Sequence, residues 1–232
     1  MNNIAEQLAL AYQKLAKNSE QQAERANLVQ LIAVSKTKSD SAIEAAYHAG
    51  QRAFGENYPQ ELASKAAALS HLPNIAWHFI GPIQSNKTRL IAEHANWVHS
   101  IDRLKIAERL SEQRPTTLPD LPILLQINIS NEAAKSGIHP SEMLTLAKAV
   151  SQLPRLQLKG LMAIPAPGDW QRLEADFAAM QQLSTELQTH YPAATELSMG
   201  MSEDWQLALR YGATMIRLGT AIFGARNYDK DE

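Results

Sequence analysis

The chain has no cysteine, no long apolar run and no excess of charge of either sign. Without cysteine, disulfides, thiolate nucleophiles and cysteine-ligated metal sites are excluded. No apolar run approaches the roughly 18 residues of a membrane-spanning helix. The 22 Lys and Arg residues nearly balance 24 Asp and Glu residues, so neither nucleic acid nor an anionic membrane is an expected partner. The seven histidines show no metal-ligand spacing with acidic residues, and no metal site is expected.

The length and hydrophobic content predict a single domain. The 232 residues are 45% hydrophobic, which suffices for one large core, and a single α/β barrel of this size is routine. No Gly/Ser linker or repeat marks a boundary, and the proline-rich stretch 115–122 is expected to be a loop. The N-terminus, Met1-Asn2-Asn3-Ile4-Ala5-Glu6, lacks the basic start and apolar core of a signal peptide. We therefore expect one cytoplasmic domain covering residues 1–232.

Strand-like and helix-like segments alternate along the whole chain. An amphipathic helix is predicted at 3–17, and a helix with a capping box at Ser41 and Glu44 is expected to stop at Gly50. Eight strands are predicted, at 31–36, 53–56, 76–81, 97–100, 123–128, 159–164, 196–198 and 215–218. Further helices are predicted at 58–69, 84–94, 103–113, 140–152, 171–189 and 203–211. This order favours a (β/α)8 barrel of the TIM type with an extra N-terminal helix; the alternative is an open, doubly wound sheet.

Lys36 ends the apolar run Leu31-Ile32-Ala33-Val34-Ser35-Lys36, which is typical of a buried parallel strand. The carboxyl ends of such strands carry the chemistry of α/β folds. A desolvated lysine there has a lowered pKa and can form a Schiff base. Taken alone, the same residue could merely cap a strand edge.

Glycine, serine and threonine gather after the last two predicted strands, in Ser198-Met199-Gly200-Met201-Ser202 and Arg217-Leu218-Gly219-Thr220. In a barrel this corner commonly binds phosphate, although the same residues also make plain turns. A Schiff-base lysine opposite a phosphate cradle meets the needs of pyridoxal 5'-phosphate (PLP). Arg217 stays protonated and, facing the pyridine nitrogen, would keep that nitrogen unprotonated and weaken the ring as an electron sink.

Seven collinear motifs resemble the pyridoxal phosphate homeostasis protein family, whose barrel is that of the N-terminal domain of alanine racemases. They are Ala33-Val34-Ser35-Lys36, Phe54-Gly55-Glu56-Asn57-Tyr58, Trp77-His78-Phe79-Ile80-Gly81-Pro82-Ile83-Gln84-Ser85-Asn86-Lys87, Lys135-Ser136-Gly137, Gly160-Leu161-Met162, Leu197-Ser198-Met199-Gly200-Met201-Ser202 and Arg217-Leu218-Gly219-Thr220-Ala221-Ile222-Phe223-Gly224. The resemblance covers essentially the whole chain. It is weakest from residue 170 to residue 195, a stretch expected to affect surface properties only.

The resemblance implies a role for each matching residue. Lys36 is the Schiff-base lysine, and Arg217 lies near the ring nitrogen. The phosphate contacts are Ser198, Ser202, Gly219 and Thr220, while Asn57 and His78 line the ring pocket. The resemblance assigns no residue a catalytic role. Lys135 stays either a loop cation or a secondary cofactor contact, and residues 84–87 stay either a helix start or a polar rim over the cofactor.

Two functions remain in view. The resemblance implies a protein that buffers PLP or delivers it to PLP-dependent apoenzymes by transient contact, without turnover. The sequence shows no dedicated dimer surface, so a monomer is expected. The alternative is a PLP-dependent enzyme such as an amino-acid racemase, which needs an acid or base on each face of the cofactor. In the resembling racemases a second domain supplies one of them, and no such domain follows Gly224 before the chain ends at Glu232. The open cofactor face expected from this favours the carrier.

Overall fold

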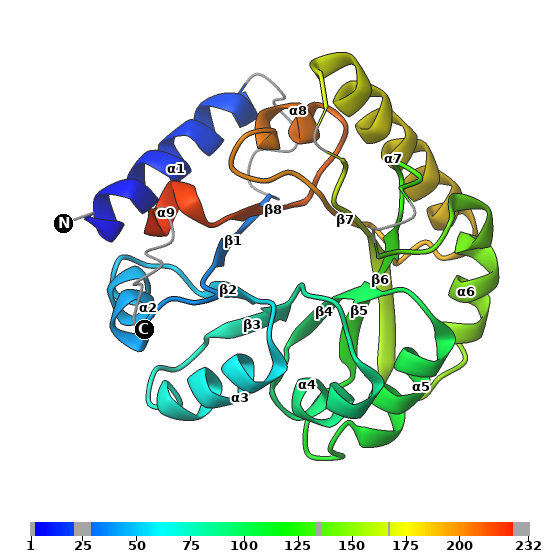
Figure 1. The fold of residues 1–232 in the computed structure, drawn as a ribbon, viewed down its shortest axis with the longest axis horizontal. Helices are drawn as coiled ribbons and strands as arrows, with labels where there is room; N and C mark the ends of the chain where they lie inside the picture. The colour runs from blue at the N-terminus through cyan, green and yellow to red at the C-terminus, as the bar shows by residue number, and fades with distance from the viewer. Residues whose placement is uncertain (1–2, 21–28, 133–135, 167, 225–232) are drawn as a thin grey trace, which may run out of the picture.

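Eight parallel strands form a closed barrel at the centre of the computed structural model, which describes residues 3–20, 29–132, 136–166 and 168–224 (Figure 1). Each strand pairs with the next along the chain, and β8 closes the ring against β1. The barrel prediction is confirmed, and the open sheet is wrong. The strands are β1 Gln30–Val34, β2 Ala53–Glu56, β3 Ala76–Phe79, β4 Trp97–Ile101, β5 Leu121–Ile127, β6 Leu156–Ala163, β7 Glu196–Ser198 and β8 Met215–Leu218.

A helix follows each strand and covers the outside of the barrel (Figure 1). These helices are α2 Asp40–His48, α3 Pro59–Ala68, α4 Thr88–His94, α5 Leu104–Gln113, α6 Met143–Val150, α7 Trp170–His190, α8 Trp205–Arg210 and α9 Thr220–Phe223, with the 3-10 turns η2 Ser85–Lys87 and η3 Pro140–Glu142 before α4 and α6. The extra N-terminal helix α1, Ile4–Glu20, packs against α2 and the short α9. It therefore helps to cover the barrel where the last helix has only four residues.

Two local predictions were wrong. Helix α2 begins at Asp40, because extended Ser39 is its N-cap and accepts a 3.3 Å hydrogen bond from the Ala42 N–H. The predicted capping box at Ser41 and Glu44 therefore lies inside the helix. The predicted loop 115–122 ends two residues early, because Pro122 lies within β5, opposite Gln157 of β6.

The core has two parts because strand side chains alternate between the two faces of the barrel wall. On β1, Leu31 and Ala33 pack into the large cluster between strands and helices, whereas Ile32 belongs to a small cluster inside the barrel. That inner cluster also contains Ala53, Leu124, Met162 and Met215. Trp97 packs against this cluster, and the buried polar residues His78, His99, Ser198 and Arg217 belong to the site described next.

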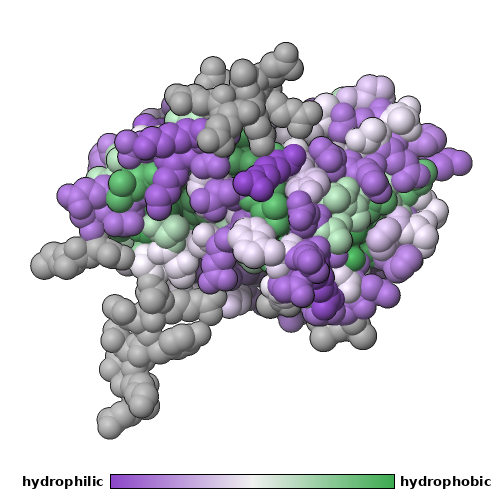
Figure 2. All heavy atoms as spheres, turned by 90° about the horizontal axis from the view of Figure 1, so that it is seen from above, coloured by the Kyte–Doolittle hydropathy of each residue, from purple (hydrophilic) through white to green (hydrophobic). Residues whose placement is uncertain are grey.

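The surface is mixed. Figure 2 shows one side of the molecule, on which hydrophilic side chains surround smaller hydrophobic areas. This is the expected outer face of amphipathic helices. Within the described ranges, no helix has both the length and the apolar character of a membrane span.

Candidate functional site

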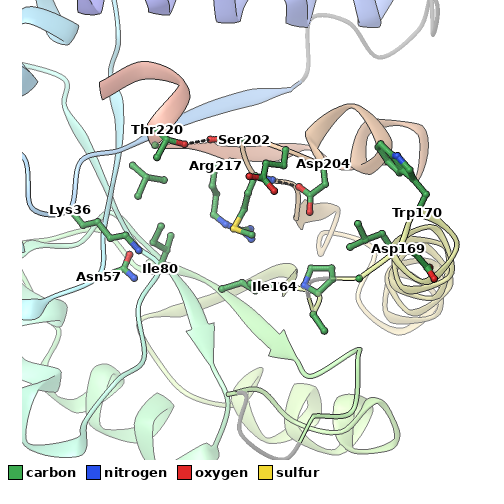
Figure 3. A pocket seen from close by; sticks show the side chains of 18 residues that line it. Lys36, Asn57, Ile80, Ile164, Asp169, Trp170, Ser202, Asp204, Arg217 and Thr220 are labelled. Carbon is green, nitrogen blue, oxygen red and sulfur yellow. Dashed lines mark hydrogen bonds between the residues drawn. The ribbon is translucent and has the colours of Figure 1, made fainter. Parts of the chain in front are cut away.

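A cavity of about 780 Å³ opens at the carboxyl ends of the strands. Six predicted site residues line it: Lys36, Asn57, Ser202, Arg217, Gly219 and Thr220. Figure 3 shows Lys36 and Asn57 on one side of the cavity, with Asp169 and Trp170 on the other. The topology brings these residues together because all follow or end parallel strands whose carboxyl ends share one mouth.

The backbone around Lys36 is fixed on both sides. Lys36 is partly buried two residues beyond the end of β1. Before it, the Ser35 hydroxyl lies 2.6 Å from Glu56 Oε1, to which it donates, and the Ser35 carbonyl accepts from Lys65 Nζ at 2.7 Å. After it, the Thr37 N–H donates to Glu61 Oε1 at 2.6 Å. These contacts set the direction in which the Lys36 side chain leaves the chain.

Behind that segment lies a buried charge cluster. Lys65, on α3, bonds Glu56 Oε1 at 2.8 Å and Glu61 Oε1 at 2.6 Å. Burial raises the pKa of the Glu56 carboxyl, while the charge and hydrogen bond of Lys65 oppose that rise. The second oxygen of Glu56 has no hydrogen-bond partner among the described residues. Glu56 therefore orients other groups and does not cap α3, whose N-cap is Tyr58.

Asn57 follows β2, and its backbone lies close to Gly81, just after the end of β3. A Cβ on Gly81 would lie 2.2 Å from the Asn57 carbonyl oxygen, so only glycine allows this approach. The Asn57 side-chain oxygen is buried and has no hydrogen-bond partner within the described part of the chain. The close packing thus holds the Asn57 backbone in place at the border of the cavity.

Two hydroxyl groups meet at the corner formed by β7 and β8. Thr220 Oγ1 donates to Ser202 Oγ at 3.2 Å (Figure 3). Ser202 reaches this corner through a turn at Gly200, which has φ of 93° and packs against Trp205. Gly219 directly precedes Thr220 and also lines the cavity. Ser202 can donate to an anion here, and Thr220 can do so when its O–H rotates away from Ser202.

Arg217, on β8, is the buried cation of the site. It is 3% exposed, and its guanidinium donates to Ser198 Oγ at 2.6 Å and to the Ala163 carbonyl at 2.9 Å. Burial lowers the pKa of Arg217 to about 10, with the charge of Asp204 opposing the shift. The guanidinium is therefore protonated at neutral pH, and three of its five N–H groups remain for other acceptors.

Two predicted site residues lie behind the cavity wall. Ser198 is fully buried, lies 2.9 Å from His99 Nδ1, and is outside the cavity lining. His78 is fully buried on β3, and its Nδ1 lies 3.0 Å from His99 Nε2. The structure thus joins both residues to Arg217 through hydrogen bonds, and their contacts with a ligand stay predictions.

Sequence reasoning missed other parts of the wall. Trp170 and Leu173 of α7 line the cavity, so the expectation that residues 170–195 affect surface properties only was wrong. Ile164 and Asp204 line it as well, and their places just after β6 and β7 were the pattern that could have indicated them.

The remaining candidates lie elsewhere. Lys87 belongs to η2 and is not in the lining, and Gln84 is the N-cap of that turn, which favours the helix-start interpretation. Lys135 lies outside the described residues. Within the described ranges, no cluster of three His, Asp or Glu side chains could hold a metal ion.

The chain is similar in sequence to proteins with a known name. The model of the family "Alanine racemase, N-terminal domain" matches residues 10–227. The pyridoxal phosphate homeostasis protein of Haemophilus influenzae is 53% identical over 234 residues, covering 99% of both chains. Its namesake in Escherichia coli K12 is 50% identical over 235 residues, covering 99% of this chain and all of the relative.

Solved structures agree with the fold. PipY of Synechococcus elongatus PCC7942, solved with PLP bound, is 41% identical and superposes with a TM-score of 0.81, covering 95% of this chain and 100% of PipY. Alanine racemase of Corynebacterium glutamicum has a TM-score of 0.70 over 99% of this chain and 63% of its own. At 16% identity, that likeness shows the fold alone. On its sequence and its fold together, the chain belongs to the pyridoxal phosphate homeostasis protein family, which has the barrel of the alanine racemase N-terminal domain.

Proposed function

We propose that this protein binds PLP in the cavity as a Schiff base on Lys36 and stores or delivers it without turnover. The observation that carries the proposal is the arrangement of an amine, a hydroxyl pair and a buried guanidinium around one cavity. The names of the relatives and the PLP-bound PipY structure support the choice of ligand.

Lys36 supplies the covalent attachment. Its ε-amine adds to the aldehyde carbon, a C=N bond forms, and the aldehyde oxygen leaves as water. No oxidant or reductant takes part, and hydrolysis returns both partners unchanged. Because the backbone on each side of Lys36 is anchored, the side chain starts from a fixed place in the cavity wall. Such reversibility suits a protein that must release what it binds.

The polar ends of PLP find complementary groups. The hydroxyls of Ser202 and Thr220 donate to the phosphate beside the backbone of Gly219. Arg217 can only donate, so a guanidinium N–H facing the ring nitrogen keeps that nitrogen as an acceptor. Asn57 lines the ring pocket next to Lys36. PLP supplies an electron sink in enzymes, and this donor would weaken it.

The cavity wall supports a carrier over a racemase. Racemisation needs a second acid or base across the cofactor from the lysine. Among the described residues, the lining contains no tyrosine, histidine or second lysine. Two of its carboxylates are engaged locally: Asp169 accepts from the Arg172 N–H, and Asp204 accepts from the Met201 N–H.

Delivery would bring the cavity mouth against an apoenzyme. Three apolar side chains of the wall are exposed there: Ile164 at 36%, Trp170 at 61% and Met201 at 38%. Exposed apolar groups at a rim favour transient protein contact.

The test of attachment is Lys36→Ala, with Lys87→Ala as the matched control outside the cavity. Wild-type protein and the control should absorb near roughly 420 nm with PLP, as a protein-bound imine does. Lys36→Ala should lose that band and keep its circular dichroism. After borohydride reduction, peptide mapping should find the label on Lys36. Label on Lys87 or Lys135 would overturn the assignment.

Turnover is tested separately by deuterium exchange at the α-carbon of L-alanine, followed by a panel of other amino acids. A carrier should exchange no faster than free PLP with the same amino acid. Exchange faster by orders of magnitude, or accumulation of D-alanine, would make the protein an enzyme.

A further inference from the structure

A chain of buried polar side chains runs from Arg217 into the barrel. Arg217 on β8 donates to Ser198 on β7, Ser198 lies 2.9 Å from His99 on β4, and His99 lies 3.0 Å from His78 on β3. His78 stacks on Trp97, with ring centroids 5.8 Å apart and planes at 7°. Its Nε2 has no hydrogen-bond partner among the described residues.

The number of protons on these side chains determines in which direction the hydrogen bonds between them run. If the Ser198 O–H donates to His99 Nδ1, then His99 carries its proton on Nε2 and donates to His78 Nδ1. Among the described residues, only the N–H at His78 Nε2 is then unsatisfied. In the reverse direction, both the Ser198 O–H and the Nε2 lone pair of His78 lack partners. Because unsatisfied buried polar groups are costly, the first direction is preferred.

This direction needs a neutral His99, which its surroundings provide. Burial lowers the pKa of His99 well below 6.5, and the neighbouring His78 and Arg217 lower it further. Burial also lowers the pKa of His78 to about 3. Neutral His99 can therefore accept the Ser198 proton, which turns the oxygen lone pairs of Ser198 toward Arg217.

The Arg217 guanidinium is therefore held by two hydrogen bonds on the side away from the cavity. One acceptor is Ser198 Oγ, oriented by His99, and the other is the Ala163 carbonyl at the end of β6. With those two N–H groups engaged, the directions of the remaining N–H groups of Arg217 are fixed. The Arg217 guanidinium therefore presents hydrogen-bond donors of fixed direction to the cavity.

We propose that His99 is a positioning residue which, through Ser198, holds Arg217 in the orientation that meets the ring nitrogen of PLP. The part of this proposal that concerns PLP rests on the proposed function. The part that concerns the orientation of Arg217 in the ligand-free protein does not. His99 is not part of the cavity lining, and Ser198 is the side chain that connects it to Arg217 by hydrogen bonds.

Two breaking variants remove the hydrogen-bonded connection between His99 and Arg217, and two restoring variants keep it with a different side chain. Ser198→Ala removes the acceptor, and His99→Phe removes the group that orients it. Ser198→Thr keeps the hydroxyl, and His99→Asn can place its side-chain oxygen where Nδ1 lies. If His99→Phe does not fold, Ser198→Ala carries the same test with a smaller change.

The first readout uses ligand-free protein. Exchange of the Arg217 Nε–H with solvent, measured by 15N NMR and assigned by its loss in Arg217→Lys, should be slow in the wild type. It should be at least several-fold faster in the two breaking variants and near wild type in the two restoring ones. Unchanged exchange in folded Ser198→Ala and His99→Phe would overturn the proposal.

The second readout uses PLP labelled with 15N in its ring. In the breaking variants the ring signal should move toward its value in free PLP, while borohydride still labels Lys36. Affinity for PLP and for pyridoxal should weaken equally, by about tenfold, the order expected for one hydrogen bond. An unchanged ring signal in the breaking variants would overturn the proposal that His99 directs Arg217 at the ring nitrogen of PLP. Absence of any Lys36 adduct in the wild type would instead sink the proposed function and leave the first readout to decide on His99.

Discussion

Replacing Lys65 with methionine should destabilise the protein by several kcal/mol, although Lys65 lies outside the cavity. Lys65 is 4% exposed and donates to the Ser35 carbonyl, Glu56 and Glu61 at 2.7, 2.8 and 2.6 Å. Lys65→Met keeps the length of the side chain but leaves Glu56 charged, fully buried and without its counter-ion. Removing one partner of a buried ion pair costs about 3–5 kcal/mol. We expect about 4 kcal/mol, because one Glu56 oxygen already has no partner among the described residues.

Urea unfolding followed by circular dichroism measures this cost, provided that the slope with urea is unchanged. Lys17→Met is the matched control, because Lys17 is exposed on α1 and should change stability by less than about 0.5 kcal/mol. The double variant Lys65→Met/Glu56→Gln should recover part of the loss, because the unpaired charge is gone. A cost below about 1 kcal/mol for Lys65→Met would refute the reasoning.

The loss of stability caused by Lys65→Met should also depend on pH. Burial raises the pKa of Glu56 above its usual 4.5, and Lys65 opposes that rise. Without Lys65 the folded-state pKa is higher still, so the folded state binds more protons than the unfolded state across that window. Stability of Lys65→Met should therefore fall as pH rises from about 4.5 through the folded-state pKa. The cost relative to wild type should be smaller at pH 5 than at pH 8, and a cost independent of pH would contradict this assignment.

Two further predictions concern the cavity. Thr220→Val should weaken PLP binding by about ten- to a hundredfold in titrations, because it removes a hydrogen bond to a charged group worth about 1.5–3 kcal/mol. Pyridoxal, which lacks the phosphate, should be nearly indifferent, and equal weakening of both ligands would make Thr220 structural. Gly81→Ala should cost about 1–3 kcal/mol and weaken PLP binding, because its Cβ would meet the Asn57 backbone at 2.2 Å. Gly168→Ala, whose Cβ would lie nearest the flexible Arg172 side chain at 3.2 Å, is the control for stability, and equal costs in stability would contradict the steric argument.

Local sequence patterns were enough to predict the barrel and one end of the site. Apolar runs of strand length alternate with helical periodicity, and this order predicted all eight strands to within a few residues. The position of Lys36 after such a run also predicted that it faces the common mouth. These features follow from the sequence because they depend on neighbours in the chain: which residues are apolar, and where a strand stops. The start of α2 at Ser39 rather than Ser41 shows that such patterns fix boundaries less well, since either serine could cap.

Only the tertiary structure decided which buried groups meet. His99 of β4 reaches Ser198 of β7 across the barrel interior, although these strands are not neighbours in the sheet. Lys65, on a helix, reaches the backbone before Lys36 at a separation of 30 residues. Strand alternation shows that a residue points inward, but its partner depends on the registers and the closure of the whole ring. The contacts of the Ser198 hydroxyl with Arg217 and His99 are such a case, whereas its contact with phosphate, implied by the family resemblance, stays a prediction.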